Sequence, residues 1–277
     1  MTKNENAGTL IEVLAGLFPN SSRTSLRSWI KEGRVLVDNA PVVRSDAPVT
    51  AGSEVQLADR KRWVGKSKSG PTLRIIYEDP YLVAVEKPEG MLSVSTQFEK
   101  QDTAHALVKA HYHPKKVFVI HRLDQDTSGV MIFALDETCY HRLKTLFEKH
   151  AIDRIYYARV SGKPDPASGT WKSYLYEDAS YRVHETDDPT RGELAITHYT
   201  LLETKGKSSI LELKLETGKK NQIRVHCNSH GCPIIGDKKY GGTGEKRLFL
   251  HAQKLAFVHP MTQKQMTFIS PVPESFR

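Results

Sequence analysis

The sequence contains few cysteines and no long hydrophobic run. Its three cysteines, Cys139, Cys227 and Cys232, are an odd number in a chain of 277 residues, which argues against a disulfide framework and for a reducing compartment. No segment approaches the roughly 18 consecutive apolar residues that a membrane helix needs. The N-terminal segment 1–8 is polar and lacks the apolar core of a secretory signal. These absences predict a cytoplasmic protein that does not bind a membrane.

Two nucleotide-binding motifs are also absent. The sequence has no Gly-Lys-Ser/Thr phosphate-binding loop and no dinucleotide glycine fingerprint, which speaks against nucleotide-driven chemistry and against hydride transfer. Hydrophobic residues make up 39% of the chain and charged residues 26%, a balance typical of a globular protein and not of a disordered or fibrous chain. At roughly 150 residues per domain, the length predicts two domains.

The chain is basic, and its excess charge is unevenly spread. It has 40 Lys and Arg against 32 Asp and Glu, a net charge of +8. Residues 1–70 hold 11 basic and 7 acidic side chains, and residues 71–277 hold 29 and 25, so a quarter of the chain carries half of the excess. Positive charge concentrated in one region is typical of proteins that bind nucleic acid, although many basic proteins bind none.

Residues 9–58 are predicted to form a small α+β domain. Apolar residues at helical spacing predict two short helices, over 10–17 and 22–33, and three short strands follow. The outer face of the second helix is basic and carries Arg23, Arg27 and Lys31, with Arg34 just beyond. Residues 59–72 are predicted to be a linker with five basic residues and no acidic residue after position 59, which suits a solubilising tether and an RNA-contacting arm about equally.

Residues 73–277 are predicted to form a second α+β domain. One amphipathic helix is expected over 137–149, with Leu143, Leu146 and Phe147 on its apolar face. Strand-like segments dominate the rest, over 73–77, 82–85, 117–120, 130–134, 155–160, 195–203, 209–215 and 248–258. Many strands with few helices predict a mixed, largely antiparallel sheet.

Two polar segments are candidates for chemistry. The segment 121–129 lies between two apolar strands and crowds basic, acidic and hydroxyl side chains together, with Asp124 best placed at a strand end. An aspartate in such a loop is more often a turn former than a nucleophile. In the segment 215–226, Ile223 and Val225 alternate with Arg224, which indicates either an arginine that reaches an anionic partner or a surface arginine on an edge strand.

The histidines and cysteines of the segment 226–232 raise the question of a zinc site. The ligand-type side chains there are His226, Cys227, His230 and Cys232. Their spacing fits no standard pair of zinc ligands, and four ligands within seven residues would have to wrap one ion tightly. We therefore expect these side chains to pack in the protein and expect no metal.

Several segments, taken together, resemble the RluA-type RNA pseudouridine synthases. Segment 121–130 resembles the central His-Arg-Leu-Asp-x-x-Thr-Ser-Gly signature, and the other matching segments are 86–90, 156–160, 217–218 with 222–226, 233–237, 239–241, and 250–252 with 259–260. The likeness runs in the family's order from about Leu73 to Pro273. Residues 9–57 separately resemble the small RNA-binding domain named after a small-subunit ribosomal protein.

The resemblance implies a fold and a set of roles. The larger domain should have the pseudouridine synthase fold. Uridine isomerisation breaks the C1′–N1 bond and rejoins the base through C5, without oxidation or hydrolysis, so no cofactor is expected. Asp124 takes the position of the nucleophile, and Arg224 takes that of the arginine that keeps the carboxylate ionised. Tyr156 takes the position of the residue that stacks on the base and assists loss of the C5 proton.

The resemblance also implies that the target uridine is flipped out of its stack. Arg122 occupies the position of the residue that fills the vacated space, and its alternatives are a phosphate contact or a salt bridge. RNA phosphates are expected to contact the basic side chains of the N-terminal domain and the linker, so that binding falls steeply with salt.

The sequence departs from the common family pattern at two places. The third motif commonly reads Thr-Gly-Arg-Thr-His-Gln, and here Lys219, Lys220 and Asn221 stand in its centre. The first motif often has Lys where this chain has Gln125. We interpret both changes as affecting contacts to the RNA backbone, so they bear on the target more than on the reaction.

The leading hypothesis is a monomeric pseudouridine synthase that acts on large-subunit ribosomal RNA, free or in an assembling particle. A synthase for transfer RNA is the first alternative. A catalytically silent RNA-binding factor for ribosome assembly is the second, and the presence of Asp124, Tyr156 and Arg224 together argues against it.

Overall fold

The computed structural model describes the whole chain except residues 1, 4–6, 20, 32–33, 39, 43, 58–62, 66–71, 97–101, 243 and 277. The described residues form two compact units, Met1–Thr72 and Leu73–Arg277. Most of the expected linker 59–72 lies outside the described residues; the short strand β7 (Trp63–Gly65) falls within it.

The first unit combines two helices with two small sheets. The helices are α1 (Leu10–Leu17) and α2 (Arg23–Lys31). The strands follow the order β1-β6-β3-β4 in one sheet and β2-β5 in the other. Their bounds are Thr2–Lys3 (β1), Gly8–Thr9 (β2), Val35–Val37 (β3), Ala40–Pro41 (β4), Pro48–Val49 (β5) and Glu54–Leu57 (β6). Leu10 and Leu14 of α1 and Leu26 of α2 are fully buried, so both helices share one core with the strands.

The basic face of α2 differs from expectation at one residue. Arg23 and Arg27 are exposed, as the helical spacing predicts. Arg34 is only 9% exposed, and its guanidinium lies 5.7 Å from the centroid of the Trp29 ring. It follows α2 where the chain turns back into β3, so it packs on the helix and does not extend the exposed basic face. The side chain of Lys31 lies outside what the structure describes.

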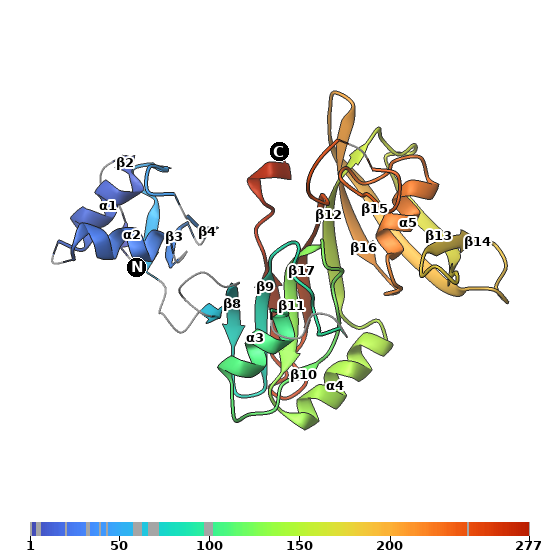
Figure 1. The fold of residues 1–277 in the computed structure, drawn as a ribbon, viewed down its shortest axis with the longest axis horizontal. Helices are drawn as coiled ribbons and strands as arrows, with labels where there is room; N and C mark the ends of the chain where they lie inside the picture. Colours follow the sequence, from blue (N-terminus) through green and yellow to red (C-terminus); the bar gives the residue numbers. More distant parts are fainter. Residues whose placement is uncertain are drawn as a thin grey trace. The chain divides into compact units, whose positions relative to one another are not determined.

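The second unit is built on one large sheet of mixed direction (Figure 1). Its strands follow the order β14-β13-β15-β16-β12-β17-β11-β9-β8, with β10 beside β11 and β18 beside β17. Every pair is antiparallel except β11 with β17, which run parallel. The bounds are Thr72–Glu78 (β8), Leu82–Lys87 (β9), Phe118–Val119 (β10), Ser128–Ala134 (β11), Asp153–Ser161 (β12), Ser168–Glu177 (β13), Val183–Thr186 (β14), Glu193–Lys205 (β15), Ser208–Leu215 (β16), Leu250–Val258 (β17) and Gln265–Ile269 (β18). The predicted α+β class with a largely antiparallel sheet is confirmed.

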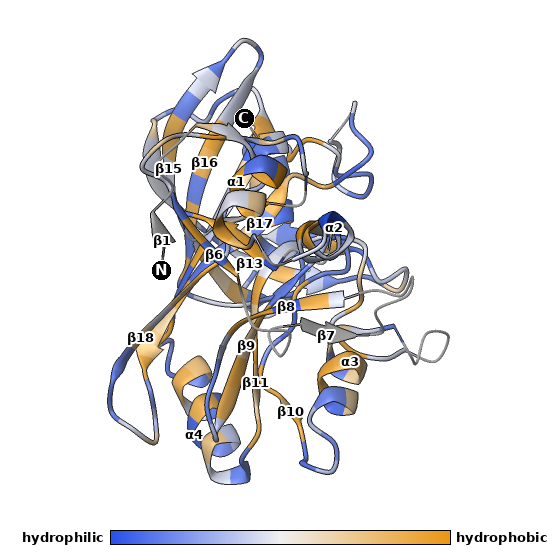
Figure 2. Ribbon diagram, turned by 90° about the vertical axis from the view of Figure 1, so that its left-hand side faces the viewer, coloured by the Kyte–Doolittle hydropathy of each residue, from blue (hydrophilic) through white to orange (hydrophobic). Residues whose placement is uncertain are grey.

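Three helices pack on this sheet: α3 (Ala104–His111), α4 (Glu137–Glu148) and α5 (Gln222–Ser229). Figure 2 shows β9 and β11 as hydrophobic along most of their length, and every residue of β11 is buried. Cys139 and Leu143 of α4 share a core cluster with Ile132 of β11. A strand covered on both faces presents a continuous apolar run, which is why β11 was recognisable from its sequence.

The segment around Arg224 is a helix, α5, and the strand expected there is wrong. Ile223 and Val225 lie about 200° apart on a helix, so they face opposite sides. Ile223 packs against the cluster of Leu211 and Leu213, and Val225 packs against the cluster of Val183. Because α5 is buried on both sides, its apolar residues show no one-sided helical period and imitate the alternation of a strand.

No helix among the described residues combines the length and the apolar character needed to cross a membrane.

Candidate active site

The segment 121–129 connects β10 to β11 and brings Asp124 to the wall of a pocket. The backbone N–H of Thr127 donates to the carbonyl of Asp124 at 3.1 Å, which closes a turn directly after the carboxylate. At the end of the turn, Gly129 has a φ of +122° and lies opposite Ala252 in the parallel β11–β17 pair. A Cβ on Gly129 would come within 2.1 Å of the Ala252 carbonyl oxygen, so only glycine allows this strand contact beside the site.

The backbone is held on both sides of Asp124. The Ser93 hydroxyl donates to the Leu123 carbonyl at 2.6 Å and accepts from the Leu123 N–H at 3.0 Å. On the other side, Lys87 Nζ donates to the Gln125 carbonyl at 2.8 Å. The backbone around Asp124 is therefore held by the side chains of Ser93 and Lys87 and by the turn that follows it.

Lys87 is fully buried, and its Nζ donates to three backbone carbonyls. Besides Gln125, its Nζ donates to the carbonyls of Met91 at 2.7 Å and Pro88 at 2.9 Å. Burial lowers the pKa of Lys87 to about 7, while the nearby carboxylates of Asp126 and Asp124 oppose that shift. An ammonium group has three N–H donors, which matches the three carbonyls. The resemblance to the family includes the segment 86–90 but implied no role for Lys87.

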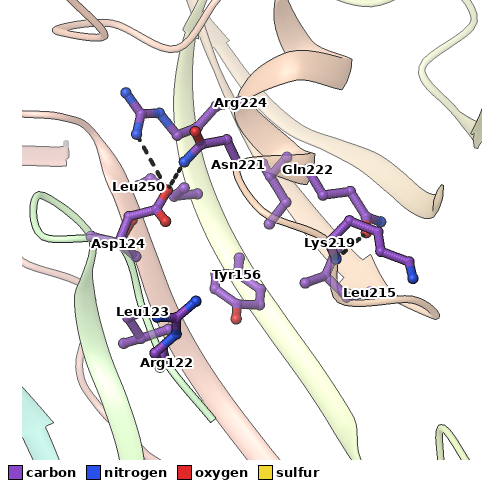
Figure 3. Close-up of a pocket in the computed structure, with 12 residues that line it drawn as sticks. Arg122, Leu123, Asp124, Tyr156, Leu215, Lys219, Asn221, Gln222, Arg224 and Leu250 are labelled. Carbon is purple, nitrogen blue, oxygen red and sulfur yellow. Dashed lines mark hydrogen bonds and ion pairs between the residues drawn. The ribbon is translucent and has the colours of Figure 1, made fainter. Parts of the chain in front are cut away.

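Arg224 bonds Asp124, as Figure 3 shows. It also bonds a second, fully buried carboxylate, that of Asp237. Its Nη1 donates to Asp124 Oδ2 at 3.2 Å, while Nε and Nη2 bond both oxygens of Asp237 at 2.7 and 2.8 Å. Burial works against the charge of Arg224, but the hydrogen bonds and charge of Asp237, together with Asp124, raise its pKa above the ordinary arginine value. The bidentate pair with Asp237 therefore fixes a permanent positive charge beside Asp124.

Asn221 makes the shortest contact to the Asp124 carboxylate. It is the N-cap of α5 and adopts the left-handed conformation, with φ 53° and ψ 18°, which asparagine tolerates better than most residues. Its Nδ2 donates to Asp124 Oδ2 at 2.6 Å, and its Oδ1 accepts from the Tyr240 hydroxyl at 3.1 Å. Asn221, which departs from the family motif, thus contacts the carboxylate itself, whereas the sequence predicted an effect on contacts to the RNA backbone.

The turn before α5 is organised by Gln222. Its Oε1 accepts from the Thr217 hydroxyl at 2.8 Å and from the Lys219 N–H at 2.9 Å. Arg154 from β12 donates to the Thr217 carbonyl at 3.1 Å. A Cβ on Gly218 would lie 2.4 Å from Arg154 Nη1, so the Thr-Gly sequence leaves space for an arginine that fixes the turn.

Tyr156 lies on β12, where the register against β17 shifts by a bulge. Figure 3 shows its ring between Asp124 and Lys219, with the hydroxyl directed away from Asp124. Burial raises the pKa of Tyr156 above its ordinary value; the charge of Arg154 opposes that rise and the charge of Asp124 adds to it. The phenol is therefore protonated at neutral pH and presents an aromatic face to the pocket.

The rim of the pocket carries two cations. Arg122 is exposed, and within the described part of the chain it forms no ion pair. Lys219 lines the opposite side and pairs with Glu193 at 2.7 Å. The complete lining is Arg122, Leu123, Asp124, Thr127, Tyr156, Leu215, Lys219, Asn221, Gln222, Ile223, Arg224 and Leu250. The structure thus brings Arg122, Asp124, Tyr156 and Arg224 into one pocket, whereas the basic residues of α2 belong to the other unit.

Apart from Leu250, the residues that line this pocket lie within a match to a known protein family. The family model described as RNA pseudouridylate synthase matches residues 81–229. The chain belongs to this family. An uncharacterized RNA pseudouridine synthase of Mycobacterium bovis is 33% identical, over 91% of this chain and 87% of the relative. Ribosomal large subunit pseudouridine synthase D of Pseudomonas aeruginosa is 31% identical, over 96% of this chain and 89% of the relative.

Solved structures agree with the assignment of this pseudouridine synthase. The human RNA pseudouridylate synthase domain-containing protein 4 is 26% identical and superposes with a TM-score of 0.61, covering 73% of this chain and 89% of that chain. Members of the family isomerise uridine in RNA, so this chain is an RNA-modifying isomerase. Its resemblance to the family, inferred from the motifs, is confirmed.

The histidine–cysteine segment of this synthase contributes to packing. The His226 ring bonds the hydroxyls of Ser173 at 3.0 Å and Thr197 at 2.8 Å, so both of its nitrogens are engaged. Cys227 and Cys232 are fully buried free thiols. Among the described residues no group of three His, Cys, Asp or Glu side chains is placed to hold a metal ion.

Proposed function

We propose that this synthase converts uridine to pseudouridine in large-subunit ribosomal RNA and that Asp124 is its nucleophile. One observation carries the assignment of Asp124: its carboxylate lines the pocket, 31% exposed, between Arg224 and Asn221, while the backbone is bonded on both sides. A preorganised anion of this kind suits attack on an electron-deficient centre of a nucleotide. The ribosomal target is supported by relatives named as large-subunit synthases.

The reaction places three demands on the site. The C1′–N1 bond breaks, the base turns and a C5–C1′ bond forms; C5 loses a proton and N1 gains one, so the atoms of substrate and product are the same. Asp124 must be ionised to attack, and the charge of Arg224 offsets the cost of burying it. The detached base must be held, and Tyr156 offers the ring of a neutral phenol on which the base stacks. Because Tyr156 lines the pocket, its phenol is also placed to assist transfer of the C5 proton.

The target uridine has to leave its stack before it can enter this pocket, which costs a few kcal/mol. Arg122 is exposed at the rim and has no ion-pair partner among the described residues. A guanidinium can stack on the neighbouring bases through its plane. We assign Arg122 the role of filling the space that the flipped uridine vacates.

The two units are proposed to have different functions, catalysis and RNA binding. Residues 73–277 form the catalytic domain, and residues 9–58 form an RNA-binding domain whose exposed Arg23 and Arg27 contact phosphates. Residues 59–72 are the basic linker between them. Arg34 is left out of the phosphate-binding set because it packs over Trp29.

The test is tritium release from C5-labelled uridine in large-subunit ribosomal RNA transcripts. The wild type is expected to release the label, and Asp124→Asn is expected to reduce the rate by at least ~10³-fold, because an amide is not a nucleophile at neutral pH. Asp126→Asn is the matched control, since Asp126 lies in the same loop, is exposed and does not line the pocket. It should retain near-normal activity.

Other outcomes redirect or reject the proposal. Release from transfer RNA transcripts but not from ribosomal RNA would move the enzyme to the alternative substrate. Retention of the label in every transcript and in nascent particles would reject catalysis and favour an RNA-binding factor. Equal loss in both aspartate variants would remove the special role of Asp124.

A further inference from the structure

The hairpin of β13 and β14 presents an aromatic side chain to solvent. Its connecting turn, 178–182, carries Tyr181, which is 73% exposed and is the most exposed large apolar side chain among the described residues. Tyr181 has a φ of 61°, a left-handed conformation that tyrosine seldom adopts. An exposed ring in an unfavourable backbone conformation does not stabilise the folded state, which suggests that its position serves a function.

The turn is held in one shape by Asp178. Its Oδ1 accepts from the N–H groups of Ser180 at 2.8 Å and Arg182 at 3.0 Å, and its Oδ2 bonds His184 at 2.6 Å. The carbonyl of Tyr181 accepts from Lys239 Nζ at 2.8 Å. These four hydrogen bonds fix the turn, so the ring is presented without a large loss of backbone entropy on binding.

Cations lie near the Tyr181 ring and near the neighbouring ring of Tyr240. Lys220 Nζ lies 5.7 Å from the centroid of the Tyr181 ring. Arg182 and Lys239 lie over the neighbouring ring of Tyr240 at 5.3 and 5.7 Å. Burial lowers the pKa of Lys239, and the positive charges of Lys220 and other cations lower it further. Glu177 pairs with Lys220 and Asp178 bonds His184, whereas neither Arg182 nor Lys239 pairs with a carboxylate among the described residues, so this surface suits an anionic partner.

Three hydrogen bonds connect this hairpin to the pocket. The N–H of Val183 donates to the Tyr240 hydroxyl at 3.1 Å, this hydroxyl donates to Asn221 Oδ1 at 3.1 Å, and Asn221 donates to Asp124 at 2.6 Å. Val183 and Tyr240 also share a buried cluster with Val225 of α5. Figure 1 shows α5 against β13 and β14. The exposed ring is thus attached to the element that forms one wall of the pocket.

We infer that the turn 178–182 is an accessory RNA site, in which Tyr181 stacks on an unpaired base near the target uridine while Arg182 and Lys220 contact phosphates. Aromatic rings flanked by cations are the usual platform for single-stranded nucleic acid, because every base has a face that stacks. The large apolar residues that a protein partner would bury are missing here, since Tyr181 stands among charged side chains. This inference rests on the proposed function for the placement of the target uridine beside Asp124.

The experiment compares variants that keep the turn intact. Tyr181→Asn removes the ring but suits the left-handed backbone, because asparagine is favoured there, so weaker binding cannot be attributed to a distorted hairpin. Tyr181→Phe keeps the stacking face. Lys220→Ala is matched by Lys205→Ala, which removes an exposed lysine at the end of β15. Affinity is measured in the full chain with a fluorescent 12-nucleotide oligouridylate, and kcat and KM are measured by tritium release from the ribosomal transcripts.

Loss of one stacked base should weaken oligouridylate binding by roughly 5- to 100-fold in Tyr181→Asn and should raise KM more than it lowers kcat. Tyr181→Phe and Lys205→Ala should stay within about twofold of the wild type. Lys220→Ala should reduce the slope of affinity against salt by about 1. Binding by Tyr181→Asn as tight as that of the wild type would overturn the inference.

The binding series is repeated in an Asp124→Asn background, where affinity does not depend on turnover. A Tyr181 effect on binding without any tritium release by the wild type would reject the proposed reaction at Asp124 and support the RNA site. Normal tritium release without a Tyr181 effect would reject the RNA site alone.

Discussion

At the scale of single residues, the pocket depends on a carboxylate that two donors share. Asp124 Oδ2 accepts from both Asn221 and Arg224, and Arg224 is itself held by the buried Asp237. Arginine supplies the charge, and asparagine supplies a short neutral hydrogen bond. Both direct an N–H at the same oxygen, so together they fix the orientation of the Asp124 carboxylate.

Asn221→Asp provides a sharp test of this arrangement. The substitution puts a second carboxylate where an amide now donates at 2.6 Å, and two carboxylates so close raise the pKa of one of them strongly. Activity at pH 7 should fall by at least ~10-fold and should recover as the pH rises toward 9, as measured by pH–rate profiles of tritium release.

Asn221→His is the matched control for this prediction. Histidine is the residue commonly found at this position in the family motif, tolerates the left-handed backbone and offers a ring N–H donor. It should retain most of the activity and an unshifted profile. A uniform loss in both variants, with unchanged pH dependence, would make Asn221 a purely structural residue.

At the scale of elements, the parallel β11–β17 pair determines where the loop 121–129 ends. This contact is the parallel one in an otherwise antiparallel sheet, and it brings the backbones together at Gly129. On the other side of the turn, Lys87 at the end of β9 donates a hydrogen bond to the Gln125 carbonyl. Three strands that are distant in the sequence thus hold one carboxylate.

Gly129→Ala should disrupt this junction. The added Cβ would clash with the Ala252 carbonyl at 2.1 Å, and we expect a loss of at least about 2 kcal/mol in the free energy of unfolding, together with reduced activity. Gly206→Ala is the control, because Gly206 has a φ of +60° but no atom within 4 Å of its virtual Cβ. It should cost only about 1 kcal/mol, for the backbone conformation. Urea denaturation of both variants measures the difference, and equal costs would contradict the steric explanation.

At the scale of the whole molecule, buried neutral histidines make stability depend on pH. Burial lowers the pKa of His121 to about 3 and that of His226 to about 4, and burial also lowers the pKa of His251. The unfolded chain takes up protons on these groups near pH 6.5, whereas the folded chain resists until much lower pH. Their contribution is therefore complete above pH 6.5 and is lost as the pH falls toward these depressed values.

Between pH 7 and pH 5 we expect each of His121 and His226 to cost about 2 kcal/mol of the free energy of unfolding. His226→Gln keeps a hydrogen-bonding side chain beside Ser173 and Thr197 but does not titrate, so its stability should fall less steeply with acid. His141→Gln, at an exposed position, should keep the wild-type slope. Urea midpoints measured from pH 5 to 8 test this, and parallel curves for all three proteins would contradict it.

The basic N-terminal unit should make RNA binding sensitive to salt. The slope of log affinity against log salt should be steep for the full chain, and Arg23→Ala with Arg27→Ala should reduce it by about 1.4 to 1.8 if both side chains contact phosphates. Arg34→Ala should leave the slope unchanged, because Arg34 lies over Trp29. A flat salt response of the wild type would remove this unit from RNA binding.

Several strands, turns and the family could be predicted, because each depends on residues that are close together in the sequence. Continuous apolar runs indicated β11 and β9, turn residues separated β15 from β16, and the motif segments indicated the family as well as Asp124, Tyr156 and Arg224. These features depend on residue type and short spacing, which a sequence contains directly. The helix α3, the hairpin of β13 and β14, and β18 were not predicted, since their patterns are short and depend on what covers them.

The tertiary structure alone decided which groups meet. Asn221 and Asp124 are separated by 97 positions, and Arg224 and Asp237 meet because a turn folds back beneath α5. Likewise, α5 is buried on both sides, which hid its helical period, and the exposure of Tyr181 follows from the turn that Asp178 closes. Residue types and spacing therefore determined the family and indicated the candidate site residues. Contacts across the sheet determined the orientation and partners of these residues, because hydrogen bonds and burial depend on distances in space and not along the chain.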